Sequence, residues 1–184
     1  MAYLRFIYGK IRGYSLLTLL RLECESLLFG LFGLVPTTFG VLLRGVVFQL
    51  MSRRCQGFAW IQPHVVIVHA DRIVVGRNFA VNSNTYLNGI GGLTIGNDVL
   101  IGSSVTISSG VHPIEGREPA VIARQSIPKP IIIEDDVWIG AGVVLIPGIR
   151  IRKGSVIGAN SVVTRDTEEY SVMVGAPARK IRSR

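Results

Sequence analysis

The chain has 184 residues, of which 48% are hydrophobic and 17% charged, and its 20 Lys and Arg residues outnumber 12 Asp and Glu residues. This composition excludes a disordered chain, and the length allows one domain with a packed core plus a short appendage. The excess of positive charge favours an anionic partner, such as nucleic acid, a membrane surface or a phosphorylated small molecule. Two cysteines, Cys24 and Cys55, do not make a disulfide framework, so a reducing compartment is the simpler interpretation.

The first 56 residues predict a pair of apolar helices. Apolar residues recur at helical spacing from Ser15 to Leu34, and Pro36 ends that run. Thr37 or Thr38 can then cap a second apolar run, which continues to about residue 52. We therefore expect an N-terminal helical hairpin.

The charges of this hairpin favour a position on a membrane surface over a position across the membrane. Seven basic residues against two acidic ones give residues 1–56 a net charge of +5. Arg21, Glu23, Glu25 and Arg44 fall inside the apolar runs, where a bilayer core would make them costly, and the first three also argue against a cleaved signal peptide. The expectation is a cytoplasmic protein that attaches to the inner membrane face, with packing of the hairpin on the rest of the protein as the alternative.

From residue 57 onward, aliphatic residues recur every six positions. Two extra residues follow Ile67 and Leu87, and about twenty follow Ile107. A helix would show a period of 3.6, whereas a six-residue step predicts one short strand and one corner per repeat, stacked as a parallel β-helix. The recurring residues are Ile61, Ile67, Val75, Val81, Leu87, Ile95, Ile101, Ile107, Ile133, Ile139, Leu145, Ile151, Ile157 and Val163.

Three stretches carry a resemblance to a known family. They are "LTIGNDVLIGSSVTI", "IIIEDDVWIGAGVVLIPGIRIRKGSVIGANSVVTRD" and "VGAPARKIR". They resemble the hexapeptide-repeat acyltransferases, most closely the galactoside and maltose O-acetyltransferases, over about residues 57–184. The resemblance implies an all-β, left-handed parallel β-helix, here preceded by the apolar α-helical hairpin, and a homotrimer with active sites between adjacent solenoids. The left hand comes from the resemblance, since the general rule for parallel crossovers favours the opposite hand.

These expectations divide the chain into three parts. Residues 1–56 form the hairpin, residues 57–170 form the β-helix with an excursion loop at 113–130, and residues 171–184 form a basic C-terminal tail.

The repeat is interrupted once at length, and His112 stands where it stops. A loop of about twenty residues inside a compact repeat is typical of a functional element. The stretch "VTISSGVH" resembles the place of the catalytic histidine in the sugar acetyltransferases, so the resemblance implies that His112 is the general base. Imidazole titrates near neutrality and can take a proton from a hydroxyl and return it to a thiolate. Either Glu115 or a backbone carbonyl would orient the ring, and a surface or capping role for His112 is the alternative.

The resemblance also implies acetyl-CoA as the co-substrate, and no metal. Small side chains would let the pantetheine arm approach the solenoid, and cationic ones would attract the nucleotide phosphates. Ala141 stands where galactoside acetyltransferases often have Ser, so one side-chain hydrogen bond is expected to be missing. The alternatives without a binding role are that Trp138 packs between subunits and that the basic C-terminus is a solvated tail. The matching positions are Trp138, Ala141, Ala159, Thr164, Arg165, Arg179, Lys180 and Arg182.

The acceptor is expected at Asn82 and Asn84 in "AVNSNTYLN", which match two asparagines of the sugar enzymes. Amides read hydroxyls well because they both donate and accept hydrogen bonds, although an Asn at a β-helix corner can also be purely structural. The next short loop, "NGIGG", lacks the acidic residues of those enzymes, so their sugar specificity is not expected to carry over.

The combined prediction is an acyl-CoA-dependent O-acyltransferase that acetylates a sugar or a membrane-linked glycan or exopolysaccharide precursor. A serine acetyltransferase-like enzyme and a non-catalytic trimeric scaffold stay open. So does a zinc protein of the γ-type carbonic anhydrase kind, which would use His64, His69 and His112, although we expect structural roles for His64 and His69. Nucleic-acid binding is not expected, because the sequence shows no aromatic platform or recognised module.

Overall fold

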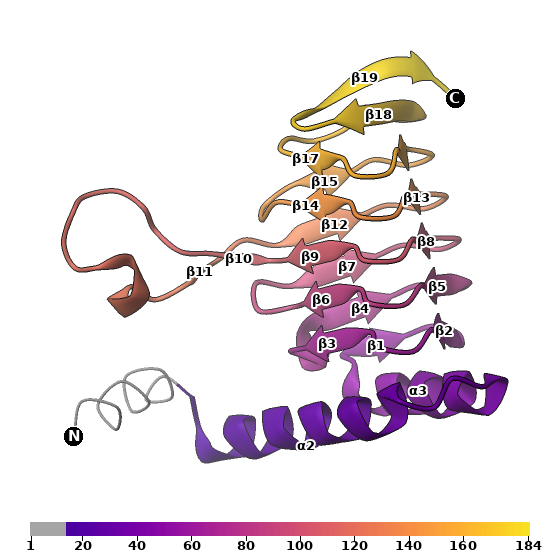
Figure 1. Cartoon of the computed structure of the whole chain (residues 1–184), viewed down its shortest axis with the longest axis vertical. Coiled ribbons are helices and arrows are strands. Elements are labelled where there is room, and N and C mark those ends of the chain that lie inside the picture. The colour runs from indigo at the N-terminus through magenta and orange to yellow at the C-terminus, as the bar shows by residue number, and fades with distance from the viewer. Residues whose placement is uncertain (1–13) are drawn as a thin grey trace.

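The computed structural model describes residues 14–184, and the expectations for residues 1–13 lie outside the described residues. The chain begins with two helices, α2 (Leu16–Gly33) and α3 (Thr38–Met51). Each helix begins at a hydroxyl side chain, Ser15 or Thr37, which accepts a hydrogen bond from a backbone N–H of the first turn. The expected helical hairpin is confirmed, and it lies across one end of the molecule (Figure 1).

The rest of the chain is a three-sided solenoid of parallel strands (Figure 1). Its three sheets are called faces A, B and C, and the chain visits them in turn. Face A contains β1 (Arg54–Cys55), β4 (Ile73–Val75), β7 (Leu93–Ile95), β12 (Ile131–Ile133) and β15 (Arg150–Ile151). Face B contains β2 (Ala59–Ile61), β5 (Phe79–Val81), β8 (Leu100–Ile101), β13 (Trp138–Ile139) and β16 (Val156–Ile157), and continues into β18 (Ser171–Gly175) and β19 (Ala178–Ser183). Face C contains β3 (Val66–Val68), β6 (Tyr86–Asn88), β9 (Thr106–Ser108), β14 (Val144–Leu145) and β17 (Val162–Val163).

The six-residue step marks the core of this solenoid. Each of the fourteen recurring aliphatic residues is no more than 2% exposed. Strand registers stack equivalent positions directly, as in Val81 beside Ile101 and Ile101 beside Ile139. Corners stack just as closely, because a Cβ on Gly102 would lie 2.7 Å from the backbone N of Ala141. The predicted parallel β-helix, with the repeated aliphatic residues in its core, is therefore confirmed.

The C-terminal segment differs from the expected basic tail. Residues 171–184 contain β18 (Ser171–Gly175), which pairs parallel with β16, and β19 (Ala178–Ser183), which pairs antiparallel with β18. Val172 and Met173 are buried against the last coil. The segment folds because Met173 stacks on Ile157 and closes the end of the hydrophobic core, while its cationic side chains stay exposed on β19.

The excursion loop leaves the solenoid between β9 and β12. Its stem is a short antiparallel pair, β10 (Gly110–Val111) with β11 (Ile127–Pro128), and its far end holds the 3₁₀ turn η2 (Val121–Ala123). Figure 1 shows the loop extending sideways, away from the coils of its own chain. Backbone pairing at the stem therefore fixes the direction in which the loop departs.

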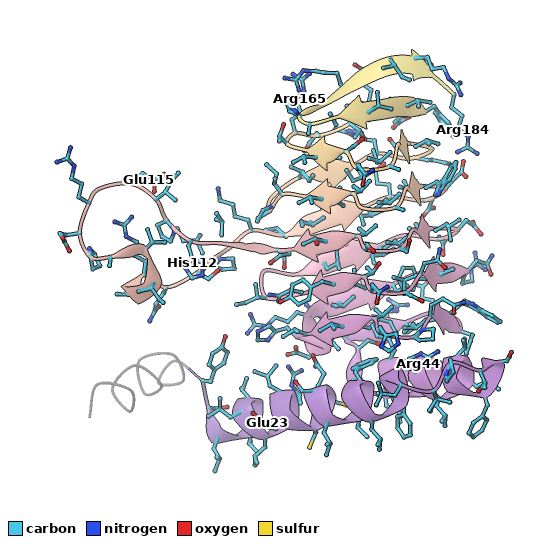
Figure 2. The ribbon with its side chains drawn as sticks, viewed as in Figure 1. Glu23, Arg44, His112, Glu115, Arg165 and Arg184 are labelled. Carbon is cyan, nitrogen blue, oxygen red and sulfur yellow. The ribbon has the colours of Figure 1, made fainter. Side chains whose placement is uncertain are left out.

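The hairpin is joined to the first coil by polar contacts as well as apolar ones. Arg44 is fully buried, and its guanidinium donates to the carbonyl oxygens of Ile61 at 2.9 Å, Phe32 at 2.7 Å and Val35 at 2.8 Å (Figure 2). Among residues 14–184, no helix combines the length and the apolar character needed to cross a membrane.

A second polar contact joins α2 to the 3₁₀ turn η1 (Ala70–Arg72). The carboxylate of Glu25 accepts a hydrogen bond from the backbone N of Ala70 at 3.1 Å, and burial raises the pKa of Glu25. Arg21 pairs with Asp71 at 2.5 Å beside it. Arg21 and Glu25, two of the charges that interrupt the apolar run, thus lie on the face of the helix that meets the solenoid, whereas Glu23 is exposed.

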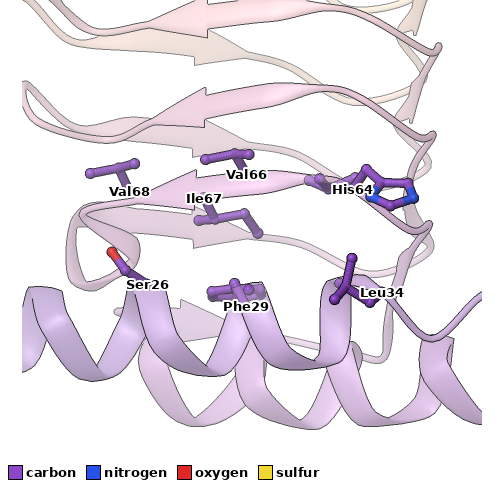
Figure 3. A pocket seen from close by; sticks show the side chains of 10 residues that line it. Ser26, Phe29, Leu34, His64, Val66, Ile67 and Val68 are labelled. Atoms are coloured by element: carbon purple, nitrogen blue, oxygen red, sulfur yellow. The ribbon is translucent and has the colours of Figure 1, made fainter.

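A pocket of about 320 Å³ lies between α2 and β3 (Figure 3). Its walls are mainly apolar, with Phe29, Leu34, Val66 and Ile67 among the lining residues, and His64 stands at one end. The pocket belongs to the junction of hairpin and solenoid, two coils away from the strand that leads into the excursion loop.

Candidate active site

His112 lies directly after β10, where the excursion loop leaves the corner between faces C and A. Its side chain is exposed and stands beside the loop stem (Figure 2). The stem is held firmly, because the backbone N of Lys129 donates to the carbonyl of Ser109 at 2.8 Å. An exposed imidazole on a fixed stem can reach a molecule bound outside its own solenoid, as a general base requires.

The corner beneath the stem is built by Ser109 and Asn88. The buried hydroxyl of Ser109 donates to the carbonyl oxygen of Asn88 at 2.9 Å and accepts from the backbone N of Gly91 at 2.8 Å. The side-chain oxygen of Asn88 accepts from the backbone N of Ile90 at 3.0 Å. These contacts explain the "NGIGG" turn as the support on which the loop exit rests.

Arg124 organises the loop itself and was not singled out from the sequence. It is 9% exposed, and its guanidinium donates to four backbone carbonyls of the loop. The acceptors are Pro119 at 2.7 Å, Pro113 at 2.9 Å, Glu115 at 2.8 Å and Gly116 at 2.8 Å. Because Pro113 is the residue after His112, this clamp also restrains the backbone that carries the candidate base. A lone Arg in an otherwise weakly patterned loop gives no sequence signal for such a role.

Glu115 does not stand beside the imidazole. Its carboxylate accepts a hydrogen bond from the backbone N of Ile114 at 3.2 Å, and Figure 2 places it farther out along the loop than His112. Of the two options left open for orienting His112, this arrangement favours a backbone group over Glu115.

The two candidate acceptor-binding residues lie at a different corner from His112. Asn82 follows β5 and Asn84 precedes β6, so both belong to the corner between faces B and C. Asn84 has a φ of 60°, in the left-handed region that Asn tolerates, so its backbone has a structural reason for that residue type. Within a single chain, these asparagines and the candidate base therefore lie at different corners of the solenoid.

Two of the candidate coenzyme-binding residues lie at the same corner as Asn82, between faces B and C, in later coils. Ala141 and Ala159 occupy equivalent places in successive coils, and the backbone N of Asn160 donates to the carbonyl of Ala141 at 2.8 Å. Both are exposed, and Trp138 on face B is 53% exposed. The small side chains leave a column of backbone open to a long, narrow ligand.

The cationic candidates fall into two groups. Thr164 and Arg165 follow β17, and both are exposed at the corner between faces C and A, above the excursion loop (Figure 2). Arg179, Lys180 and Arg182 lie on β19 at the end of face B. Lys180 pairs with Glu168 at 2.6 Å, which offsets part of its charge, so the arginines are the stronger candidates for phosphate.

The other two histidines lie in the first coil. His64 is exposed, and its backbone N donates to the carbonyl of Gly33 at 3.2 Å. His69 is buried, with its ring stacked on Tyr14 at a centroid distance of 6.1 Å, and burial lowers its pKa. Residues 14–184 contain no group of three or more His, Cys, Asp or Glu side chains arranged to hold a metal ion.

A three-sided parallel solenoid, broken once by a loop that carries an exposed histidine, defines a protein of the hexapeptide-repeat class. Residues 92–112 and 130–165 match the family described as the hexapeptide repeat of succinyl-transferase. Galactoside O-acetyltransferase of Escherichia coli K12 is 40% identical over 124 residues, which cover 67% of this chain and 60% of that protein.

Two solved structures are similar over most of their length. Galactoside acetyltransferase in complex with coenzyme A is 31% identical with a TM-score of 0.81, over 92% of this chain and 83% of that one. A hexapeptide-repeat acetyltransferase of Vibrio cholerae, complexed with acetyl coenzyme A, is 31% identical with a TM-score of 0.76, over 88% and 87%. The chain belongs to the hexapeptide-repeat acetyltransferase family, and its solenoid is the left-handed parallel β-helix of that family.

Proposed function

We propose that this protein is an acetyl-CoA-dependent O-acetyltransferase that acts on a sugar hydroxyl. The observation that carries the proposal is His112, exposed at the exit of the one long excursion from the described coils. The coenzyme A complexes of two similar structures and the galactoside O-acetyltransferase relative support the same donor and the same class of acceptor.

In this proposal His112 acts as the general base. Its free ring nitrogen takes the proton of the acceptor hydroxyl as the oxygen bonds to the thioester carbonyl carbon. The carbon–sulfur bond then breaks, and the imidazolium returns the proton to the leaving thiolate. The ring is unchanged after one cycle, and no covalent enzyme intermediate is needed.

The distribution of candidate residues supports a homotrimer. Asn82, Ala141 and Ala159 lie at one corner of the solenoid, whereas His112 and Arg165 lie at another. If the first corner of one copy faces the second corner of the next, repetition of that contact closes a ring, and each interface assembles a complete site. The excursion loop then reaches over the neighbouring copy, which accounts for its direction away from its own coils.

The remaining candidate residues have defined tasks in this proposal. Asn82 and Asn84 bind acceptor hydroxyls through their amides. Trp138, Ala141, Ala159 and Thr164 line the pantetheine arm. Arg165, Arg179, Lys180 and Arg182 attract the phosphates of the donor. The acceptor is a lipid-linked glycan or exopolysaccharide precursor, met at the cytoplasmic face of the membrane where acetyl-CoA is available.

The test is thiol release from acetyl-CoA against a panel of free sugars and lipid-linked glycans. His112→Ala should lower kcat by about 10²- to 10⁴-fold, the usual contribution of a general base, with little change in KM for acetyl-CoA. His64→Ala is the matched control, because His64 is also an exposed histidine but lies in the first coil. Full activity of His112→Ala would reject His112 as the base, and no thiol release by the wild type would favour a non-catalytic trimeric scaffold. Serine as the preferred acceptor would replace the sugar.

A further inference from the structure

The outer face of the helical hairpin is apolar. Ten large apolar side chains of α2, α3 and their connection are between 47% and 79% exposed. On α3 they recur three or four residues apart, and on α2 most are three, four or seven apart, so on each helix they gather on the side opposite the buried residues. Soluble proteins rarely leave so large an apolar surface open to water. The ten residues are Leu16, Leu17, Leu20, Leu27, Leu31, Leu34, Phe39, Leu42, Val46 and Leu50.

Three of the four charged residues of the same helices lie on the other side, and the fourth, Glu23, lies among the outward-facing leucines of α2. Arg21, Glu25 and Arg44 make their contacts with the solenoid or with the loop between the helices. Of the four charged residues of α2 and α3, Glu23 is the one that is exposed. A helix on the surface of a water-soluble protein shows the reverse pattern, with its charges outward.

We propose that this face docks on an anionic lipid bilayer and lies at the lipid surface without crossing it. Arg53 and Arg54 are exposed directly after α3, where the chain passes from the hairpin into β1, and their charges suit anionic headgroups. A protein partner fits less well, because protein interfaces carry roughly one hydrogen bond per 100–200 Å². The face offers few groups for such bonds, chiefly Glu23 and Gln49.

The position of the hairpin sets the orientation of the whole chain. Both helices lie across the end of the solenoid, so docking makes the solenoid stand upright on the membrane (Figure 1). His112 leaves the third coil, which is two strand spacings of about 4.8 Å above the first coil. With a helix layer of about 10 Å beneath, the candidate base stands roughly 20 Å above the lipid. This part rests on the proposed function, since a sugar held by a lipid carrier would project to a similar height.

Vesicle flotation of the full chain tests the docking surface. The vesicles are phosphatidylcholine alone, or phosphatidylcholine with about a third phosphatidylglycerol as the anionic lipid. We expect the wild type to float with the anionic vesicles. Leu27→Gln/Leu31→Gln should weaken that binding by at least about tenfold, because two exposed leucines no longer enter the lipid. Arg53→Gln/Arg54→Gln should weaken it several-fold on anionic vesicles alone.

Ile181→Gln is the matched control, because Ile181 is 60% exposed on β19 at the opposite end of the solenoid, and it should float like the wild type. Failure of the wild type to float, or equal flotation of the leucine variant, would overturn the proposal. The proposal would also be overturned if the molar mass of the protein in solution, without vesicles, showed two assemblies joined together and the leucine substitutions halved that mass. A second copy of the protein would then cover the apolar face. Thiol release with soluble sugars needs no vesicles, so loss of docking with retained His112-dependent release leaves the proposed function standing.

Discussion

Asn82 and His112 lie at different corners of the same solenoid. Asn82 follows β5 in the second coil, between faces B and C, and His112 follows β9 and β10, between faces C and A. The excursion loop carries His112 away from its own coils (Figure 2). In the homotrimer that we propose, a reaction that uses both residues takes them from two copies of the chain.

This separation predicts complementation between two inactive variants. His112→Ala and Asn82→Ala should each be nearly inactive alone. If each site takes His112 from one copy and Asn82 from the next, random mixing of equal amounts leaves about a quarter of the interfaces intact. Refolding the two variants together should thus restore about a quarter of the wild-type thiol release. The two variants refolded separately and then mixed as assembled protein are the control, and a refolded mixture with no gain over them would contradict the shared site.

We predict that substitution of Arg124 lowers activity without lowering global stability. Arg124→Lys cannot reproduce the fork that binds four carbonyls of the loop, so the backbone beside His112 should lose its fixed position. We expect kcat to fall about tenfold or more and the loop to be cut faster by protease. The melting temperature should change little, because the solenoid core does not depend on the loop. Arg117→Lys, an exposed arginine of the same loop, is the control, and equal protease resistance of the two variants would show that the clamp is dispensable.

The sequence predicted the elements that repeat and missed the contacts that do not. Ile133 or Val163 could be assigned to the core from spacing alone, because every coil buries the same position. Arg44 gave no such signal, since its three carbonyl partners come from α2, its following turn and β2, and only the fold brings them together. The strand at Ser171–Gly175 was missed because the residues before it break the six-residue step, although Val172 and Met173 are buried.

The candidate site was predictable as a set of residue types and less so as an arrangement. His112 and the small residues Ala141 and Ala159 follow from motif and resemblance. The sequence does not show that they lie at separate corners, because corner identity depends on how many strands precede each residue in its coil. The loop support by Arg124 also depends on tertiary contact alone.

We predict that His69 makes the stability of the folded state sensitive to acid. Its pKa is lowered by burial and by the nearby positive charge of Arg72, with Asp71 acting in the opposite direction. In the unfolded chain the ring takes up a proton as the pH falls through about 6.5, while the folded chain resists it to a lower pH. The folded state therefore loses stability below pH 6.5, by at most about 1.4 kcal/mol at pH 5.5.

His69→Asn should remove that loss, and Asn suits the left-handed backbone at this position, where φ is 58°. The measurement is the change in melting temperature between pH 7.5 and pH 5.5, which should be smaller for the variant than for the wild type. The raised pKa of Glu25 has the opposite effect, because protonation of its carboxylate favours the folded state as the pH falls. Glu25 is present in both proteins, so this contribution cancels in the comparison. His64→Asn changes the same residue type at a φ of 60° and should keep the wild-type response, because His69 is intact. Identical pH responses of His69→Asn and the wild type would show that His69 does not cause the acid loss.

Arg44 predicts how strongly the hairpin is attached to the solenoid. Arg44→Met keeps much of the apolar stem but leaves the carbonyls of Ile61, Phe32 and Val35 without their donor in a buried position. At about 1 kcal/mol for each lost hydrogen bond, the free energy of unfolding should fall by about 3 kcal/mol. Urea unfolding followed by far-ultraviolet circular dichroism measures this fall, and Arg54→Met, at an exposed arginine just after α3, is the control. Because the lost bonds join α3 to both α2 and β2, the helical signal should be lost at a lower urea concentration than the β-signal. A single transition at the wild-type midpoint would show that apolar packing alone holds the hairpin in place.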